Sequence, residues 1–236
     1  MSATTDTKSS TRKHPMPFTR IEVILMTLVD AELSALLARR AEAPYAGQWA
    51  LPGGVLRIDL DASLEDAAAR VVGERLATDL PDLRQLCAVG GPKRDPRAPW
   101  GLSIVYRALS PSGAAKPSAG KRIEELRWAP VASLADRASL AFDHASLVAR
   151  AIAALREDVD ELDLPYGLLP QTFTLTELQQ TCEAVTGHLL DKSSFRRRLN
   201  DRDVLEAVDG EMRTGAFRPA QLYRRRTPAP RLGSRR

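Results

Sequence analysis

The stretch that decides the fold of the C-terminal third is FTLTELQQTCEAVTGHLLDKSSFRRRLN, residues 173–200. Thr174 and Glu177 have the spacing of a capping box, which predicts that a helix begins here. Gly187 is a candidate for the residue that ends this helix. Between these signals lies an apolar stripe with helical spacing: Leu178, Cys182 and Val185.

A second helix is predicted from Lys192 to about Asp201, with Asp191 as its N-terminal cap. Phe195 and Leu199 are its apolar anchors. The short connection between the two helices is typical of a helix-turn-helix, whose second helix reads the major groove. Arg can read guanine, Asn can read adenine, and Ser and Lys can hold phosphates. The residues predicted to contact DNA on this helix are Lys192, Ser193, Ser194, Arg196, Arg197 and Asn200.

Two short strands are predicted after this helix, at residues 204–208 and 220–224, around a tip at residues 210–219. Arg213 and Arg218 belong to that tip and are predicted to contact DNA from it. Two helices followed by such a hairpin indicate a winged helix. The alternative is a helical packing subdomain with a solvated basic face.

Charge is distributed unevenly along the 236 residues, whose net charge is +4. Residues 191–236 hold 13 basic and six acidic side chains, an excess of seven positive charges, whereas residues 161–190 hold four acidic and no basic ones. A basic end on a nearly neutral body favours a polyanionic partner, nucleic acid before a membrane.

Upstream, the pattern predicts a separate α/β domain at residues 18–160, joined to a domain at 161–226 through a hinge at 162–167. Residues 1–17 are predicted to be a disordered tail and 227–236 a basic tail. Strands are predicted at 19–29, 33–39, 83–90, 100–109 and 123–128, and helices at 63–78 and 142–160.

Within the helix predicted from Ser63, positions 71, 74 and 75 are spaced so that their side chains converge. Three carboxylates at such positions would bind Mg²⁺ and place it on a diphosphate. Here the positions hold Val71, Glu74 and Arg75, so one carboxylate is left beside a guanidinium. Phosphoryl transfer depends on positioning and electrostatics, so this pattern disfavours a hydrolase.

The segment GQWALPGG (47–54), followed by a helix containing Arg70-Val71-Val72-Gly73-Glu74-Arg75, resembles a Nudix domain. The Nudix motif ends in Arg-Glu-apolar-x-Glu-Glu, and two of its three carboxylates are replaced here. The upstream Glu falls on Ala62, and Gly54 lies 16 residues before Arg70 where the family has 14. The resemblance implies the fold, with a mixed sheet and helices, and without catalytic residues or a metal site. Weak residual hydrolysis through Asp59, Asp61 or Glu65 stays open.

A Nudix pocket without a metal keeps its shape for a nucleotide, and guanidinium groups bind diphosphates bidentately. Arg39 and Arg40 end a strand near the pocket; the alternative is an exposed strand end. Gly53 and Gly54 allow close approach to a ligand; the alternative is a plain turn. Arg70 and Arg75 can neutralise phosphate, and Glu74 can instead pair with Arg70. The predicted ligand-binding set is Arg39, Arg40, Gly53, Gly54, Arg70, Glu74 and Arg75.

The stretch LLPQTFTLTELQQTCEAVTGHLLDKSSFRRRL, with a basic wing ending in RPAQLY, resembles the Nudix-related transcriptional regulators. Phe142-Asp143-His144 matches a similar triplet of that family at the start of the long connecting helix. The resemblance, over about residues 18–226, implies a dimeric repressor that binds a palindromic operator and responds to ADP-ribose or a related nucleotide. It also implies NAD metabolism genes as targets. The alternative is a Nudix hydrolase of ADP-sugars with a C-terminal dimerisation domain.

Other classes of protein are disfavoured by composition. No apolar run approaches the roughly 20 residues of a membrane span, and the first 20 residues do not form a secretory signal. Two cysteines cannot form a disulfide framework, and the three histidines lack the spacing of a zinc site. A loop with Lys93, Arg94 and Arg97 is predicted to be solvated. We therefore expect a cytoplasmic protein without a cofactor or a membrane partner.

Overall fold

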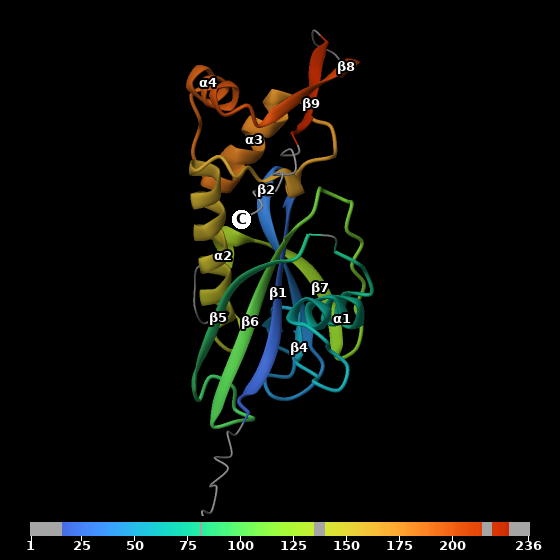
Figure 1. Ribbon diagram of the computed structural model, residues 1–236. Helices are drawn as coiled ribbons and strands as arrows, with labels where there is room; N and C mark the ends of the chain where they lie inside the picture. Colours follow the sequence, from blue (N-terminus) through green and yellow to red (C-terminus); the bar gives the residue numbers. More distant parts are fainter. Residues whose placement is uncertain (1–15, 81, 135–139, 214–218, 227–236) are drawn as a thin grey trace, which may run out of the picture.

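The computed structural model describes residues 16–80, 82–134, 140–213 and 219–226, in the arrangement that Figure 1 draws. A seven-stranded mixed sheet with helices is followed by a winged helix, so the predicted fold class is confirmed. The predicted tails, 1–17 and 227–236, lie outside the described ranges except for residues 16 and 17. The sheet strands are β1 (Phe18–Val29), β2 (Glu32–Arg40), β3 (Trp49–Ala50), β4 (Gly53–Val55), β5 (Arg84–Pro92), β6 (Trp100–Leu109) and β7 (Ile123–Pro130).

Strand β1 is the centre of the sheet. It forms an antiparallel hairpin with β2 and lies parallel to β6 on its other side. The order along the sheet is β3-β2-β1-β6-β5, with β4 added to β1 and β7 to β2. Because β4 and β7 pair with strands that already have neighbours, the sheet divides into two arms, β5-β6-β1-β4 and β7-β2-β3. The strand ends between these arms line a cleft.

Helices α1 (Leu64–Leu76) and α2 (His144–Asp160) cover opposite faces of the sheet (Figure 1). Alternation along β1 explains this arrangement, because successive side chains point to opposite faces. Ile21 and Val23 pack with α1, and Ile24 packs with α2. Val71, predicted to converge with the side chains of Glu74 and Arg75, is buried in the α1 layer. It cannot present a side chain to a ligand.

The C-terminal region contains α3 (Leu175–Thr186), α4 (Lys192–Arg202), β8 (Leu205–Arg213) and β9 (Ala220–Arg225). Its helix caps follow the sequence prediction. Thr174 and Glu177 form a capping box, Gly187 ends α3 with a φ of 80°, and the Asp191 side chain accepts a hydrogen bond from the Ser194 amide. Strand β8 was predicted to end at Val208, but it continues to Arg213 because its pairing with β9 resumes after an irregularity.

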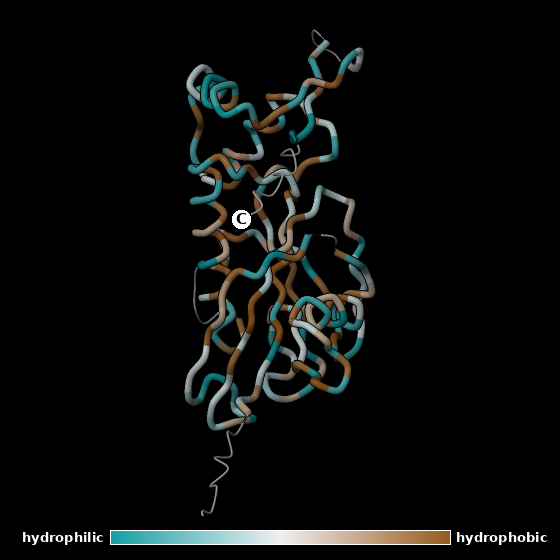
Figure 2. Tube along the Cα trace, in the orientation of Figure 1, coloured by the Kyte–Doolittle hydropathy of each residue, from teal (hydrophilic) through white to brown (hydrophobic). Residues whose placement is uncertain are grey.

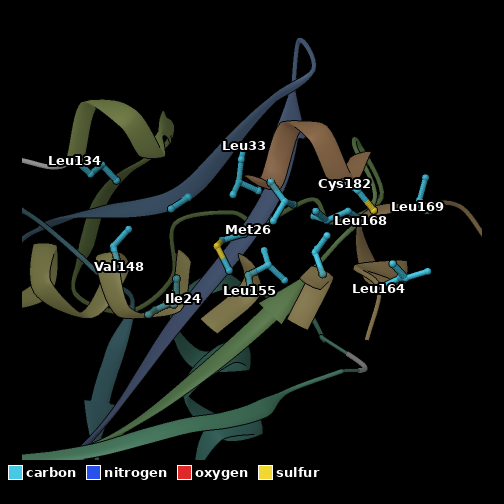
Figure 3. Close-up of a cluster of buried hydrophobic side chains, with 14 of the residues drawn as sticks. Ile24, Met26, Leu33, Leu134, Val148, Leu155, Leu164, Leu168, Leu169 and Cys182 are labelled. Carbon is cyan, nitrogen blue, oxygen red and sulfur yellow. The ribbon is translucent and has the colours of Figure 1, made fainter. Parts of the chain in front are cut away.

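The segment predicted as a hinge is packed rather than exposed. Helix α2 does end at Asp160, and the chain then enters a short 3-10 helix, η3 (Tyr166–Leu168). Leu162, Leu164 and Leu168 are all buried, because they enter the same apolar cluster as α2 and α3. Figure 3 shows this cluster running from Ile24 of the sheet to Cys182 of α3. The two regions therefore share one core.

Candidate ligand cleft and nucleic-acid interface

Five arginines line a cleft at the ends of the sheet arms, with about 480 Å³ of empty space. They come from strands, helix α1 and loops that lie far apart in sequence: Arg20, Arg40, Arg75, Arg97 and Arg122. The floor is made of Ala50, Leu51, Pro52 and Gly53, and the one acidic residue in the lining is Glu42. Guanidinium groups pair bidentately with phosphate oxygens, so this composition favours an anionic ligand.

The backbone holds several of these arginines in place. Arg40 donates from Nε to the Pro44 carbonyl oxygen at 2.6 Å, and Arg75 donates from Nε to the Gly53 carbonyl oxygen at 3.0 Å. Arg122 pairs with Glu42 at 3.2 Å. Hydrogen bonds to carbonyl oxygens fix a guanidinium without neutralising it. Arg40 and Arg75 therefore keep their positive charge available to a ligand.

Crowding of the positive charges is visible in the arginine pKa values. Burial lowers the pKa of Arg40, and the charges of Arg20 and Arg97 lower it further. Burial also lowers the pKa of Arg75, with a further contribution from Arg122. An anion placed among these groups would relieve both effects, because it offsets the lost solvation and the repulsion.

A buried carboxylate lies next to the floor of the cleft. Glu22 is 1% exposed, and its Oε1 accepts a hydrogen bond from Nε of Arg20 at 2.7 Å. Burial by itself raises the pKa of Glu22, but Arg20 and His144 outweigh it and hold the pKa at about 2. A Cβ at Gly53 would lie 1.9 Å from Oε2 of Glu22. Gly53 is therefore required by the close approach of β4 to this carboxylate.

Three of the predicted ligand residues line the cleft: Arg40, Gly53 and Arg75. Arg39 does not, because consecutive strand residues point to opposite faces, and it pairs instead with Glu124 at 3.1 Å. Gly54 does not either. A Cβ there would lie 2.7 Å from Cγ2 of Val71, so this glycine accommodates α1 packing.

Arg70 and Glu74 also lie outside the cleft lining. Arg70 donates to both carboxylate oxygens of Asp61, at 2.6 and 2.8 Å, and to the Val55 carbonyl oxygen. Glu74 lies 3.6 Å from Arg70, as the alternative interpretation predicted, and 3.8 Å from Lys121. Arg70 therefore ties α1 to the loop before it, whereas Glu74 faces the loop before β7.

The second candidate surface is helix α4, which projects at one end of the molecule (Figure 1) and is largely hydrophilic (Figure 2). Phe195 and Leu199 are buried, as predicted, so the other faces of the helix point to solvent. Among the described residues, Arg196 and Arg197 have no ion pair or hydrogen bond. The predicted DNA-contacting residues that α4 exposes are Lys192, Ser193, Ser194, Arg196, Arg197 and Asn200.

The two wing residues differ from those of α4. Nη1 of Arg213 donates to Oε1 of Glu177 at 2.6 Å, so this side chain fastens β8 to the start of α3. Arg218 lies outside the described residues. Arg198, next to the two free arginines of α4, donates to the Asp160 carbonyl oxygen and connects α4 to the end of α2.

Comparison with known proteins agrees with both regions. Residues 19–151 match the model of the NUDIX domain, and residues 165–225 match the model described as NrtR DNA-binding winged helix domain. A protein of Acinetobacter baylyi (strain ATCC 33305 / BD413 / ADP1), described as ADPR responsive transcriptional repressor NtrR, is 36% identical over 211 residues. The match covers 89% of this chain and 83% of that protein. The chain belongs to the NrtR family.

Solved structures of Shewanella oneidensis NrtR are similar to this chain. The complex with a 27mer DNA has a TM-score of 0.75 and 34% identity, covering 88% of this chain and 93% of that one. The NUDIX domain complexed with ADP ribose has a TM-score of 0.54 and 32% identity, covering 60% of this chain and 90% of that one.

Three cleft arginines of this NrtR-family chain were not predicted: Arg20, Arg97 and Arg122. Arg97 was assigned to a solvated loop, but that loop folds back through ion pairs. Arg97 pairs with the buried Asp95, and Arg94 donates to both carboxylate oxygens of Asp143. One signal was available in the sequence, since Arg20 and Glu22 are the charged residues of a strand, β1, that is mostly apolar.

The carboxylates near α1 are engaged by other side chains in this NrtR-family chain. Asp61 is held by Arg70, Asp59 pairs with Arg57 at 2.8 Å, and Glu65 accepts from the Tyr106 hydroxyl at 3.4 Å. Within the described ranges, no three His, Cys, Asp or Glu side chains gather in a way that could hold a metal ion. No helix there is long and apolar enough to cross a membrane.

Proposed function

We propose that this protein is a transcriptional repressor that binds operator DNA through α4 and the wing and senses ADP-ribose through the arginine cleft. The observation that carries the proposal is the cleft itself, where five arginines line one space and two of them, Arg40 and Arg75, are held by carbonyl oxygens instead of carboxylates. The A. baylyi relative, described as ADPR responsive, and the S. oneidensis complexes with DNA and with ADP ribose support the same assignment.

The diphosphate of ADP-ribose is the part of the ligand that the cleft fits best. Arg40 and Arg75, which are held by carbonyl oxygens, supply guanidinium donors, and the Gly53 backbone lines the cleft beside them. In a hydrolase Mg²⁺ neutralises the phosphate oxygens, and in this cleft the guanidinium charges would neutralise them instead. Binding should therefore persist in EDTA.

Hydrolysis is disfavoured for the same reason. A Nudix hydrolase needs convergent carboxylates on α1 to hold the metal that activates its diphosphate bond. Here Val71 is buried, Arg75 places a cation at the third position, and Glu74 is engaged by Arg70. A unit charge at about 4 Å is worth several kcal/mol at an effective dielectric near 20, so Arg75 opposes metal binding strongly.

Helix α2 is suited to connect the cleft with the DNA-binding region. At its start, His144 accepts a hydrogen bond from the Leu51 amide, and Leu51 lines the cleft. Phe142, just before α2, lies under the guanidinium of Arg40 at 5.1 Å. At the other end, Arg156 donates to the Val185 carbonyl oxygen of α3. A ligand that shifts α2 would shift α3 and α4 with it, provided that its affinity differs between the two positions.

The DNA target is proposed to be a palindrome bound by a homodimer in the cytoplasm. Two-fold symmetry would place two α4 helices in successive major grooves, about 34–36 Å apart. The regulated genes are proposed to be those of NAD metabolism.

A titration of promoter DNA, from the protein's own operon or a neighbouring one, tests the proposal. Binding is measured by fluorescence anisotropy in EDTA, with and without ADP-ribose. We expect the protein to bind the promoter specifically and ADP-ribose to change the affinity of that binding. Light scattering should show that the protein is a dimer. Turnover of ADP-ribose above about 1 s⁻¹ with Mg²⁺ or Mn²⁺ lies in the normal range of enzymes and would favour the hydrolase instead.

A further inference from the structure

A second cleft lies where the sheet meets the C-terminal region, with about 390 Å³ of empty space. Arg84 and Arg107 line it from β5 and β6, Asp158 lines it from the end of α2, and Arg225 lines it from β9. The cleft is therefore built from both regions of the chain and lies apart from the arginine cleft.

The carboxylates of this junction cleft are already paired. Asp158 accepts from Nη2 of Arg107 at 2.5 Å. Asp163 and Asp82 both pair with Arg84, at 3.1 and 3.6 Å. A cation would have to displace an arginine from each of them, so the site is not built for a metal ion.

Two arginine donors are left over. Nη1 of Arg107 is buried and has no hydrogen-bond partner among the residues that the structure describes, in a residue that is 9% exposed. Arg225 has no ion pair within the described part of the chain, and its guanidinium lies over the Tyr166 ring at 5.2 Å. A buried donor without a partner costs free energy, more so when it is charged. Since three arginines and three aspartates line the cleft, the surplus among the described residues is of unpartnered arginine donors and not of net charge.

We propose that the junction cleft binds a small oxyanion, the phosphate or carboxylate group of a small molecule, between Arg107 and Arg225. The anion would accept from the unpartnered Nη1 of Arg107 and would neutralise Arg225. It would connect β6 of the sensor sheet with β9 of the wing. Such a ligand favours the present arrangement of the two regions to the extent that it binds this arrangement more tightly than others.

The proposal is independent of ADP-ribose sensing, and the test reads the two sites separately. Inorganic phosphate is titrated into the full chain at constant ionic strength, and amide resonances are followed by NMR. The Gly167 amide reports on the junction cleft and the Gly53 amide on the arginine cleft, because each residue lines only one of them. We expect a saturable shift at Gly167. A parallel titration with malonate distinguishes carboxylate from phosphate as the preferred group.

Variants assign the shift to the two arginines. Arg107→Gln and Arg225→Gln should each weaken binding at Gly167 about tenfold, the effect of one lost charge-assisted hydrogen bond. Arg225 is exposed, so its variant should fold even if Arg107→Gln does not. Arg224→Gln, on the same strand but not in the cleft lining, should change binding less than twofold. A Gly167 shift that is absent or linear for both anions, or is equally strong in Arg225→Gln, overturns the proposal.

Discussion

The arginines of the ligand cleft and those of α4 have the same type of side chain, but they differ in burial and in hydrogen-bond partners. Arg40 and Arg75 are partly buried and held by carbonyl oxygens, whereas Arg196 and Arg197 are exposed and have no partner among the described residues. Fixed donors select a ligand by shape, because their geometry is set before it binds. Free donors adapt to a flexible polyanion, and their contacts with phosphates are sensitive to salt. The same residue type thus supplies a selective pocket and a broad contact surface.

The largest expected effect is on DNA binding. Arg196→Ala combined with Arg197→Ala should weaken promoter binding at least about 30-fold, since each lost contact costs about 1–3 kcal/mol. Each lost phosphate contact should also lower the salt slope by about 1. Anisotropy titrations at several salt concentrations measure both.

The matched control for this pair is Arg150→Ala, which removes an exposed charge from α2 instead. It should bind DNA as the unmodified chain does. A double variant that keeps its circular dichroism spectrum and still binds the promoter normally would remove α4 from the DNA interface.

The second effect concerns the cleft and uses two neighbouring residues. Arg40→Ala should weaken ADP-ribose binding about 10- to 100-fold, the loss of charge-assisted hydrogen bonds. Arg39→Ala should change it less than twofold, because Arg39 pairs with Glu124 on the other side of β2. Calorimetry in EDTA measures both affinities. Equal losses in the two variants would contradict the assignment of the cleft.

The third effect concerns stability and pH. The pKa of Glu22 is lowered from 4.5 to about 2, so its ionised form stabilises the fold by about 3 kcal/mol above pH 4.5. This contribution is lost as the pH falls from about 4.5 towards 2. Glu22→Gln should therefore be less stable at pH 7, and the difference should shrink over that range.

Urea unfolding at a series of pH values measures the difference between the two chains. The exposed Glu32→Gln should follow the unmodified chain throughout. A gap between Glu22→Gln and the unmodified chain that stays constant down to pH 2 would mean that Glu22 acts by packing and not by charge.

The smallest effect is expected at the wing. Arg213→Ala removes a half-exposed ion pair with Glu177, so the free energy of unfolding should fall by no more than about 1 kcal/mol. If Arg213 acts by fastening β8 to α3, the salt slope of DNA binding will not change. If Arg213 instead releases Glu177 and contacts a DNA phosphate, as the sequence predicted, Arg213→Ala will lower the salt slope of DNA binding by about 1.

Local signals in the sequence determined the elements of this protein. Helix caps such as Thr174, Gly187 and Asp191 depend on neighbouring residues, so they could be predicted without the fold. The apolar periodicity that buries Phe195 and Leu199 also depends only on neighbouring residues. It predicted that Arg196 and Arg197, on the other faces of α4, point to solvent. The loss of carboxylates from the Nudix helix was also visible in the sequence.

Only the tertiary structure decided which cations share a cleft. Arg20, Arg97 and Arg122 come from three segments that the two-armed sheet brings together, and no spacing in the sequence encodes that contact. The structure also separated neighbours: Arg40 faces the ligand and Arg39 does not, because strand alternation and the pairing of β2 with β7 set their directions. Helix α1 uses Arg70 for its own packing. Pairing between distant segments determines these outcomes, whereas caps and periodicity depend on residues close in sequence.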